Sequence, residues 1–214
     1  VMKMLEGRIF GDVPTMTGET WGELLARIPE VKSTNLIRSL DNPLYDLPGL
    51  QILRGNLAPN GAIIRPTGVP KEMHVFRGKA KCFDNDTKAY NAIMAGEIVP
   101  GDVIVMRYEG CKGAPGMKEL MLSIDALIGL GLDKKVGLIT DARFSGFNYG
   151  AIVGHVSPEA YDGGVIALIE NGDEIEMDIA GGTVNLLVSD EVLAERRKSW
   201  VRPPLKQQKG VLNI

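Results

Sequence analysis

A short polar segment, Thr140–Gly146, brings the side chains of Asp141, Arg143 and Ser145 together between small residues. It directly follows the largely apolar run Lys135–Ile139, which is typical of a β-strand. Proteins of the α/β class place their chemistry where a strand ends, because the strand is rigid while the loop beyond it is free to carry function. An ordinary turn, in which Asp141 and Ser145 bond the local backbone, would use the same residue types.

A second strand with the same kind of ending lies upstream. The apolar run Val103–Met106 leads into Arg107–Glu119, a segment rich in glycine and in charged residues, and a helix is predicted to begin near Met117. The interval between Glu119 and Ser145 has room for one helix and one strand, which would return the chain to the same end of the sheet. We therefore expect the two loops to meet.

Four segments carry a more specific signal. They read LRGNLAPNGA at 53–62, RYEGCKGAPGMKE at 107–119, TDARFSG at 140–146 and GHVSPEA at 154–160. In this order they resemble the C-terminal domain of the dihydroxy-acid dehydratase family, where the patterns run RGNLAPDGA, RYEGPKGGPGMRE, TDGRFSG and GHISPEA. The family includes 6-phosphogluconate dehydratase and the sugar-acid dehydratases. The resemblance implies a swivelling β/β/α barrel-like domain and a hydro-lyase that converts a 2,3-dihydroxy acid to a 2-keto acid, as in branched-chain amino-acid biosynthesis.

That reaction must remove a weakly acidic proton and expel hydroxide, and metal ions assist both steps. The resemblance implies Mg²⁺ and an iron–sulfur cluster, with Glu119 as one Mg²⁺ ligand and Ser145 as the residue that removes the proton. A serine hydroxyl is too weak a base at neutral pH unless a neighbouring cation favours its alkoxide, so Ser145 depends on the metal. Glu119 could equally be a solvated residue that favours the dipole of the predicted helix.

The remaining site residues flank these two. Arg143 and Gly146 match positions expected to bind substrate, because the guanidinium fork suits a carboxylate or phosphate. Arg143 could instead form a structural pair with Asp141. Asp141 and Glu109 are expected to support the site from behind, without touching the substrate.

Two further features leave alternatives open. Three glycines of the second loop could let backbone N–H groups approach an anion, or they could simply form turns; they are Gly110, Gly113 and Gly116. His155 follows an apolar run and has no adjacent cysteine or carboxylate, so we expect a packed histidine that does not touch the site.

Several positions depart from the family pattern beside the expected pocket. Cys111 stands where the pattern has proline, and Ala114 and Ala142 stand where it has glycine. The stretch 146–149 is larger and less polar than usual. These changes bear on the substrate and on full activity, and Phe144 favours a branched-chain dihydroxy acid over a sugar acid.

Composition narrows the class of protein. The 214 residues are 44% apolar, enough for a real core, and the net charge of −3 comes without a basic cluster of the kind that binds nucleic acid. No apolar run reaches the roughly 18–20 residues that span a bilayer, and no signal peptide begins the sequence, which favours the cytoplasm. Cys82 and Cys111 are far apart and outside any CxxC pair, so a cluster held by this chain alone is not expected.

Two parts are predicted along the chain. Residues 1–48 are expected to form a helical arm, with a helix at Trp21–Ile28 capped by Thr17 or Thr20. Residues 49–214 are expected to form a mixed α/β domain, a curled or closed sheet with flanking helices. Its predicted strands are 51–54, 62–65, 74–81, 103–108, 136–140, 165–170, 174–179 and 183–188, and its predicted helices are 86–94, 117–128, 158–161 and 190–199.

Two local signals are stronger than the others. Asn171-Gly172 favours a type I′ turn, which predicts a hairpin between strands 165–170 and 174–179. Ser189 can cap a helix over 190–199 that carries acidic residues first and basic residues last.

The resemblance also implies partners. The cluster cysteines and the other Mg²⁺ ligands would lie in an N-terminal half outside this chain, so the chain alone is expected to be inactive. The complete enzyme would be a homodimer acting on a small dihydroxy acid, with no nucleic acid or membrane partner. Two alternatives remain: half of an aldonate or 6-phosphogluconate dehydratase, and a non-catalytic, regulatory swivelling domain.

Overall fold

A computed structural model of the chain describes residues 1–30, 36–145, 148–206 and 209–210. It contains two compact units, Val1–Asp46 and Leu47–Ile214. The first unit holds a 3₁₀ helix, η1 (Met2–Arg8), and α1 (Trp21–Ala26). The hydroxyl of Thr20 accepts from Glu23 N at 3.2 Å, and Glu23 Oε2 accepts from Thr20 N at 2.7 Å. This capping box explains why α1 begins where the sequence predicts, with Thr20 as the cap.

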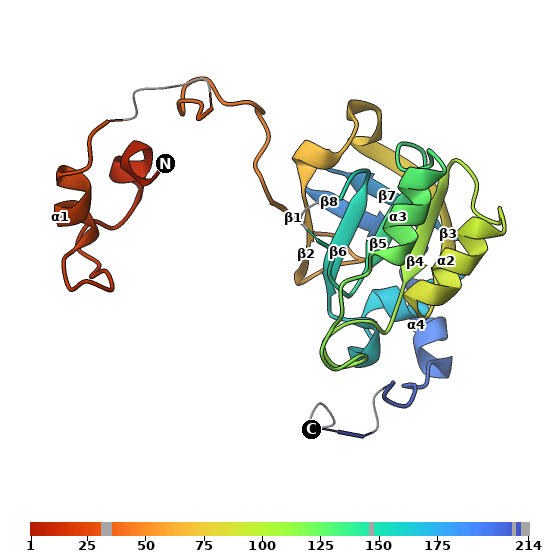
Figure 1. Ribbon diagram of the computed structural model, residues 1–214. Coiled ribbons are helices and arrows are strands. Elements are labelled where there is room, and N and C mark those ends of the chain that lie inside the picture. The colour runs from red at the N-terminus through yellow and green to blue at the C-terminus, as the bar shows by residue number, and fades with distance from the viewer. Residues whose placement is uncertain (31–35, 146–147, 207–208, 211–214) are drawn as a thin grey trace. The chain divides into compact units, whose positions relative to one another are not determined.

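The second unit is built around one mixed sheet of eight strands in the order β1-β2-β6-β5-β4-β3-β7-β8 (Figure 1). Strands β3 to β6 run parallel to one another, whereas β1, β2, β7 and β8 are joined antiparallel. The strands are β1 (Gln51–Leu53), β2 (Gly61–Ile64), β3 (Val75–Phe83), β4 (Asp102–Met106), β5 (Gly137–Thr140), β6 (Ile152–Ser157), β7 (Glu174–Asp178) and β8 (Thr183–Leu186). The predicted mixed α/β fold, a curled sheet with flanking helices, is confirmed.

The sheet is nearly closed into a barrel by contacts between its two outer strands. Arg54 pairs with Thr183, and the side-chain amide of Asn56 exchanges two hydrogen bonds of 2.8 Å with the backbone of Leu186. A Cβ atom at Gly55 would overlap the carbonyl oxygen of Val184, so the seam requires glycine there. The first family-like segment, residues 53–62, therefore includes the barrel seam.

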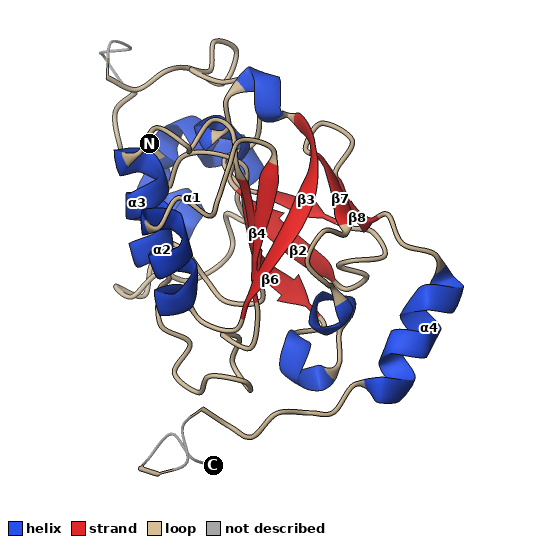
Figure 2. Ribbon diagram, turned by 90° about the vertical axis from the view of Figure 1, so that its right-hand side faces the viewer, coloured by secondary structure: helices blue, strands red, loops and turns tan. Residues whose placement is uncertain are grey.

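Alternation along β4 shows how the strands divide the core. Val103 and Val105 belong to the cluster that fills the barrel, whereas Ile104 and Met106 belong to the cluster under the helices. The helices over that outer face are α2 (Asp86–Met94) and α3 (Leu122–Gly129). Figure 2 shows them together on one side of the strands, with α4 (Asp190–Ser199) on the other side. Because both faces of β4 are covered, its sequence is apolar at almost every position.

Three local expectations were wrong. Residues 165–168 form a 3₁₀ helix, η5 (Val165–Leu168), so Asn171-Gly172 makes a turn but joins no two-strand hairpin. The helix expected from Met117 begins only at Leu122, because Met117 has a left-handed φ of 38° and Glu119 is paired with Arg143 in an isolated bridge. The helix expected at 158–161 is a 3₁₀ turn, η4 (Ala160–Asp162).

The short helices η2 (Pro66–Gly68) and η3 (Lys71–Met73) connect β2 to β3. Within the described part of the chain, no helix combines the length and apolar character needed to cross a membrane.

Candidate active site

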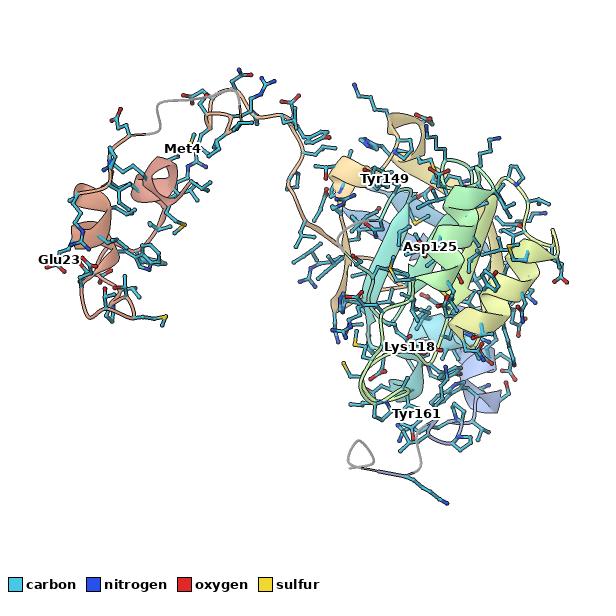
Figure 3. All side chains as sticks on the ribbon, viewed as in Figure 1. Met4, Glu23, Lys118, Asp125, Tyr149 and Tyr161 are labelled. Atoms are coloured by element: carbon cyan, nitrogen blue, oxygen red, sulfur yellow. The ribbon has the colours of Figure 1, made fainter. Side chains whose placement is uncertain are left out.

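The candidate site lies where β4, β5 and β6 end. Because these strands are parallel, the loops that follow them leave the same edge of the sheet, here called the carboxyl edge. We call residues 107–121 the glycine-rich loop and residues 141–151 the serine segment. In Figure 3, Lys118 of the glycine-rich loop and Tyr161, just beyond β6, lie at one end of the barrel, and Tyr149 lies at the other. The serine segment thus starts at the carboxyl edge and returns to the amino end of β6.

The glycine-rich loop and the serine segment meet next to two of the expected site residues, Glu119 and Ser145. Glu119 pairs with Arg143, two residues before Ser145, and Leu120 N donates to the carbonyl oxygen of Arg143 at 3.2 Å. The side chain of Glu119 is exposed and forms no hydrogen bond or ion pair with any described residue. Because α3 begins at Leu122, Glu119 is not a first-turn helix residue, and its exposed carboxylate is open to solvent or to a cation.

Ser145 borders a cavity of about 300 Å³ on the outer face of β2 and β6. Polar groups at this cavity come from Arg65, Asn148 and His155, while Ile63, Phe144 and Ile152 contribute apolar surface. Glu119 does not line it. Gly146, the other expected substrate-binding residue, lies outside the described residues.

Asp141 fastens three strand ends to one another. Its buried carboxylate accepts hydrogen bonds from Tyr108 N at 3.1 Å, Glu109 N at 3.1 Å and Ala160 N at 2.9 Å. Burial raises the pKa of Asp141, and these three N–H donors oppose that rise. No ion pair joins Asp141 to Arg143 among the described residues, so the structural pair considered for Arg143 is wrong.

Glu109 is also buried, and its carboxylate accepts from Lys206 Nζ at 2.8 Å. A buried carboxylate requires such a partner. Glu109 and Asp141 therefore hold the glycine-rich loop; that they support a catalytic site stays a prediction.

The backbone N–H groups of the glycine-rich loop bind a carboxylate of this same chain, that of Glu159. Glu159 Oε1 accepts from Lys112 N at 2.9 Å, and Glu159 Oε2 accepts from Gly113 N at 3.3 Å. A Cβ atom at Gly110 would overlap the same carboxylate. Gly110 and Gly113 thus allow the close approach of an anion, which is the Glu159 side chain, whereas Gly116 has a left-handed φ of 93°, as in a turn.

His155 is not the packed residue that the sequence suggested. It is exposed, has a left-handed φ of 56°, and borders both the Ser145 cavity and a neighbouring cavity of about 590 Å³ that Cys111 and Glu159 also line. Although the residue is exposed, partial burial of its ring and the nearby charge of Arg143 lower the pKa of His155. Its apolar surroundings in sequence gave no signal of this position.

Strained backbone gathers at the same loops. The described non-glycine residues with positive φ are Tyr108, Met117 and His155, and each belongs to the carboxyl edge. Left-handed backbone costs about 1–3 kcal/mol for such residues and tends to persist where function requires it. This clustering supports a functional site here.

Metal-binding potential in the chain is limited. No group of three His, Cys, Asp or Glu side chains within the described ranges is placed to hold a metal ion. The exposed Glu119 carboxylate offers oxygen atoms of the kind that Mg²⁺ prefers, and a complete Mg²⁺ site would need further ligands beside it. Cys82 is partly buried, burial raises its thiol pKa to about 11, and Cys111 contacts Met117 Sδ at 3.2 Å. These two cysteines do not fit an iron–sulfur cluster, which takes several thiolates.

The nearly closed barrel with its loops at the carboxyl edge defines a class, a mixed-sheet barrel domain that carries polar loops where its parallel strands end. Residues 35–214 match the family model described as dihydroxy-acid/6-phosphogluconate dehydratase C-terminal. The chain belongs to this family, as its four segments suggested.

Curated relatives agree with this assignment. A dihydroxy-acid dehydratase of Geotalea daltonii is 50% identical over 201 residues, which cover 94% of this chain. Proteins of the same name from Nostoc sp. and Francisella tularensis subsp. novicida are 49% and 46% identical over 99% of the chain. The chain spans 36% of the length of the first relative and 38% of the other two.

Proposed function

We propose that this chain is the C-terminal domain of a dihydroxy-acid dehydratase, acting with an N-terminal part on a small branched 2,3-dihydroxy acid. The observation that carries the proposal is the pairing of Glu119 with Arg143, two residues before Ser145, at the carboxyl edge. Residues 1–48 would connect the two parts. The expected homodimer and cytoplasmic location stay predictions.

The reaction removes the C2 proton and the C3 hydroxyl of the substrate as water, and the resulting enol tautomerises to a 2-keto acid. In this proposal Ser145 accepts the C2 proton on Oγ. Glu119 offers a carboxylate oxygen to Mg²⁺. A bound Mg²⁺ would supply positive charge that favours the serine alkoxide and offsets the charge developing on the substrate carboxylate.

Arg143 would hold the substrate anion. Its side chain is exposed beside Glu119, and Asp141, the alternative partner, is occupied by three backbone N–H groups. A guanidinium can bind a carboxylate with two parallel hydrogen bonds. An iron–sulfur cluster, if the complete enzyme has one, would be held by the N-terminal part.

The lining of the Ser145 cavity supports an aliphatic substrate. Ile63, Phe144 and Ile152 offer apolar surface that suits a branched hydrocarbon group. A sugar acid would bring several hydroxyls that this surface leaves without partners. Activity on a branched dihydroxy acid should therefore exceed activity on an aldonic acid.

The test uses the complete protein with its N-terminal part. Ser145→Ala should lower kcat about 10²–10⁴-fold, the usual contribution of a general base, without changing the Mg²⁺ requirement. Glu119→Gln should raise the Mg²⁺ concentration needed for half-maximal activity, and excess Mg²⁺ should restore part of the rate, because a charged ligand is lost. The measurement is a Mg²⁺ titration of initial rates.

Two variants on α4 serve as matched controls. Ser199→Ala and Glu195→Gln change the same residue types, and Ser199 and Glu195 bond only within that helix among the described residues. Both should behave as wild type. A wild-type rate for Ser145→Ala would show that Ser145 is only a turn residue.

A further inference from the structure

The far end of the serine segment is held against the barrel by one side chain. Arg65 directly follows β2, and its Nη2 donates to the carbonyl oxygen of Asn148. The guanidinium carbon lies 5.7 Å from the centre of the Tyr149 ring, within the range of a cation–π contact. Gly150 N donates to the carbonyl oxygen of Gly68 at 3.0 Å, so backbone pairing completes the attachment.

The position of Arg65 leaves one of its N–H groups buried without a hydrogen bond to any described residue, which is energetically unfavourable. Its Nε is buried and has no hydrogen-bond partner among the described residues. A Cβ atom at Gly68 would approach Arg65 Nη2 to 2.7 Å and the Asn148 oxygen to 2.8 Å, so the backbone at Gly68 makes room for the guanidinium. Buried polar groups without partners are rare in native proteins and require an explanation.

The contact between Arg65 and Asn148 offers an explanation for the unpaired N–H group. Arg65, Asn148 and Ser145 border the same cavity, and only the undescribed residues 146–147 separate Ser145 from Asn148. On the other side, Arg143 is fixed by its pairing with Glu119. Ser145 thus comes two residues after the paired Arg143 and three residues before Asn148, which Arg65 holds.

We infer that Arg65 is a positioning residue for Ser145, fixing the end of the serine segment so that the hydroxyl is held at the reacting carbon. The inference rests on the proposed function, in which Ser145 takes the proton. Proton transfer requires close and directed contact between donor and acceptor. A displacement of about 1 Å can cost roughly 10²-fold in rate.

The experiment measures steady-state rates of the complete enzyme. Arg65→Met should lower kcat roughly 10²-fold with KM and the Mg²⁺ requirement nearly unchanged, because the base is misplaced while Glu119 and Arg143 keep their positions. Arg65→Lys keeps the charge and one donor for Asn148 but loses the planar group over Tyr149, so it should restore part of the rate. If Arg65→Met does not fold, the reduced kcat of Arg65→Lys at unchanged KM carries the test.

The double variant with Ser145→Ala separates positioning from general damage. A residue that acts only through Ser145 should cause no further loss of kcat once the hydroxyl is gone. Arg202→Met is the matched control: Arg202 Nε donates to the carbonyl oxygen of Tyr161 at 3.0 Å, and its guanidinium lies 5.1 Å from that ring. It should keep the wild-type kcat.

Three results would overturn the inference. They are a wild-type kcat in both Arg65 variants, an equal loss in Arg202→Met, or a further loss of the same size when Arg65→Met is combined with Ser145→Ala. If Ser145→Ala itself runs at the wild-type rate, the proposed function fails as well. If Ser145→Ala is slow and the Arg65 variants are not, only the inference fails.

Discussion

The two loops at the carboxyl edge are held in opposite ways. The glycine-rich loop, which presents Glu119, is fastened by three carboxylates of Asp141, Glu109 and Glu159. The serine segment is paired through its backbone at Arg143 and gripped by Arg65 near its other end. The loop expected to bind the cation is thus held through carboxylates, whereas the far end of the serine segment is held by one arginine and by the backbone bond from Gly150 N to Gly68 O. The comparison teaches that the two loops share Asp141 and the Glu119–Arg143 pairing, whereas Glu159 supports only the glycine-rich loop and Arg65 only the serine segment.

Asp141 is the one described carboxylate that joins both supports, so its loss should have the largest effect on stability. Asp141→Ala leaves three N–H groups without an acceptor, two of them buried and that of Tyr108 partly buried, and a buried N–H without an acceptor costs about 1–3 kcal/mol. We expect the free energy of unfolding of this chain to fall by about 3 kcal/mol or more. Urea denaturation checks this, and activity of the complete enzyme should fall as well.

Asp102→Ala is the matched control. Asp102 is also buried, but it accepts a single backbone N–H, from Val99 at 2.9 Å, at the opposite end of β4. Its loss should cost about 1–3 kcal/mol and leave kcat unchanged. An equal cost for the two variants would mean that Asp141 does not act as a shared fastening.

The sequence predicted those parts of the fold whose signal is local. α4 runs over Asp190–Ser199 as predicted, because Ser189 caps its start and acidic and basic residues favour its two ends. The strand predicted at residues 165–170 was wrong because side chains distant in the sequence decide the structure there. Arg107 binds the carbonyl oxygens of Ala167 and Ile169, and Arg196 binds that of Leu168, so these carbonyls need no strand partner.

At the site, too, the sequence predicted the features that local motifs encode but not those that depend on distant contacts. The motifs located Glu119, Arg143 and Ser145, and parallel strands explain why their loops meet. The contacts of Glu159 with Lys112 and of Arg65 with Asn148 join residues 47 and 83 positions apart. No local pattern encodes such pairings, so the supports of the site became visible only in three dimensions.

Glu159→Gln should disturb the glycine-rich loop alone. The neutral amide accepts the N–H groups of Lys112 and Gly113 more weakly than a carboxylate does, a loss of about 1–2 kcal/mol. Hydrogen exchange should therefore quicken at these two amides while the Asn148–Gly150 end keeps its protection. The Mg²⁺ requirement of the complete enzyme should rise.

Asp162→Asn provides the control for this variant. Asp162 pairs with the Lys112 side chain at 2.6 Å on the surface, where solvent screens an ion pair so that it contributes little to stability. Exchange at the Lys112 and Gly113 amides should stay as in wild type. Faster exchange throughout the serine segment in Glu159→Gln would show that the two supports are coupled.

The smallest effect expected is a difference in pH dependence between Asp141 and Asp173, a carboxylate that lines neither of the two cavities at the site. Burial raises the pKa of Asp141 above 3.8, so its contribution to stability declines as the pH rises from 3.8 through the raised value. Burial also acts on Asp173, but hydrogen bonds from Arg196 and Glu170 N bring its pKa below 3.8. Its contribution is present above 3.8 and is lost as the pH falls through the lowered value.

Urea unfolding of Asp141→Asn and Asp173→Asn between about pH 3 and pH 7 compares the two windows. The stability advantage of wild type over Asp173→Asn should grow with pH below 3.8 and then stay level. The free energy of unfolding of wild type should fall relative to that of Asp141→Asn as the pH rises above 3.8. Slopes of the same sign would mean that the three N–H donors outweigh burial at Asp141, and the shared fastening would then be strongest when ionised, under the conditions in which Ser145 and Glu119 must work together.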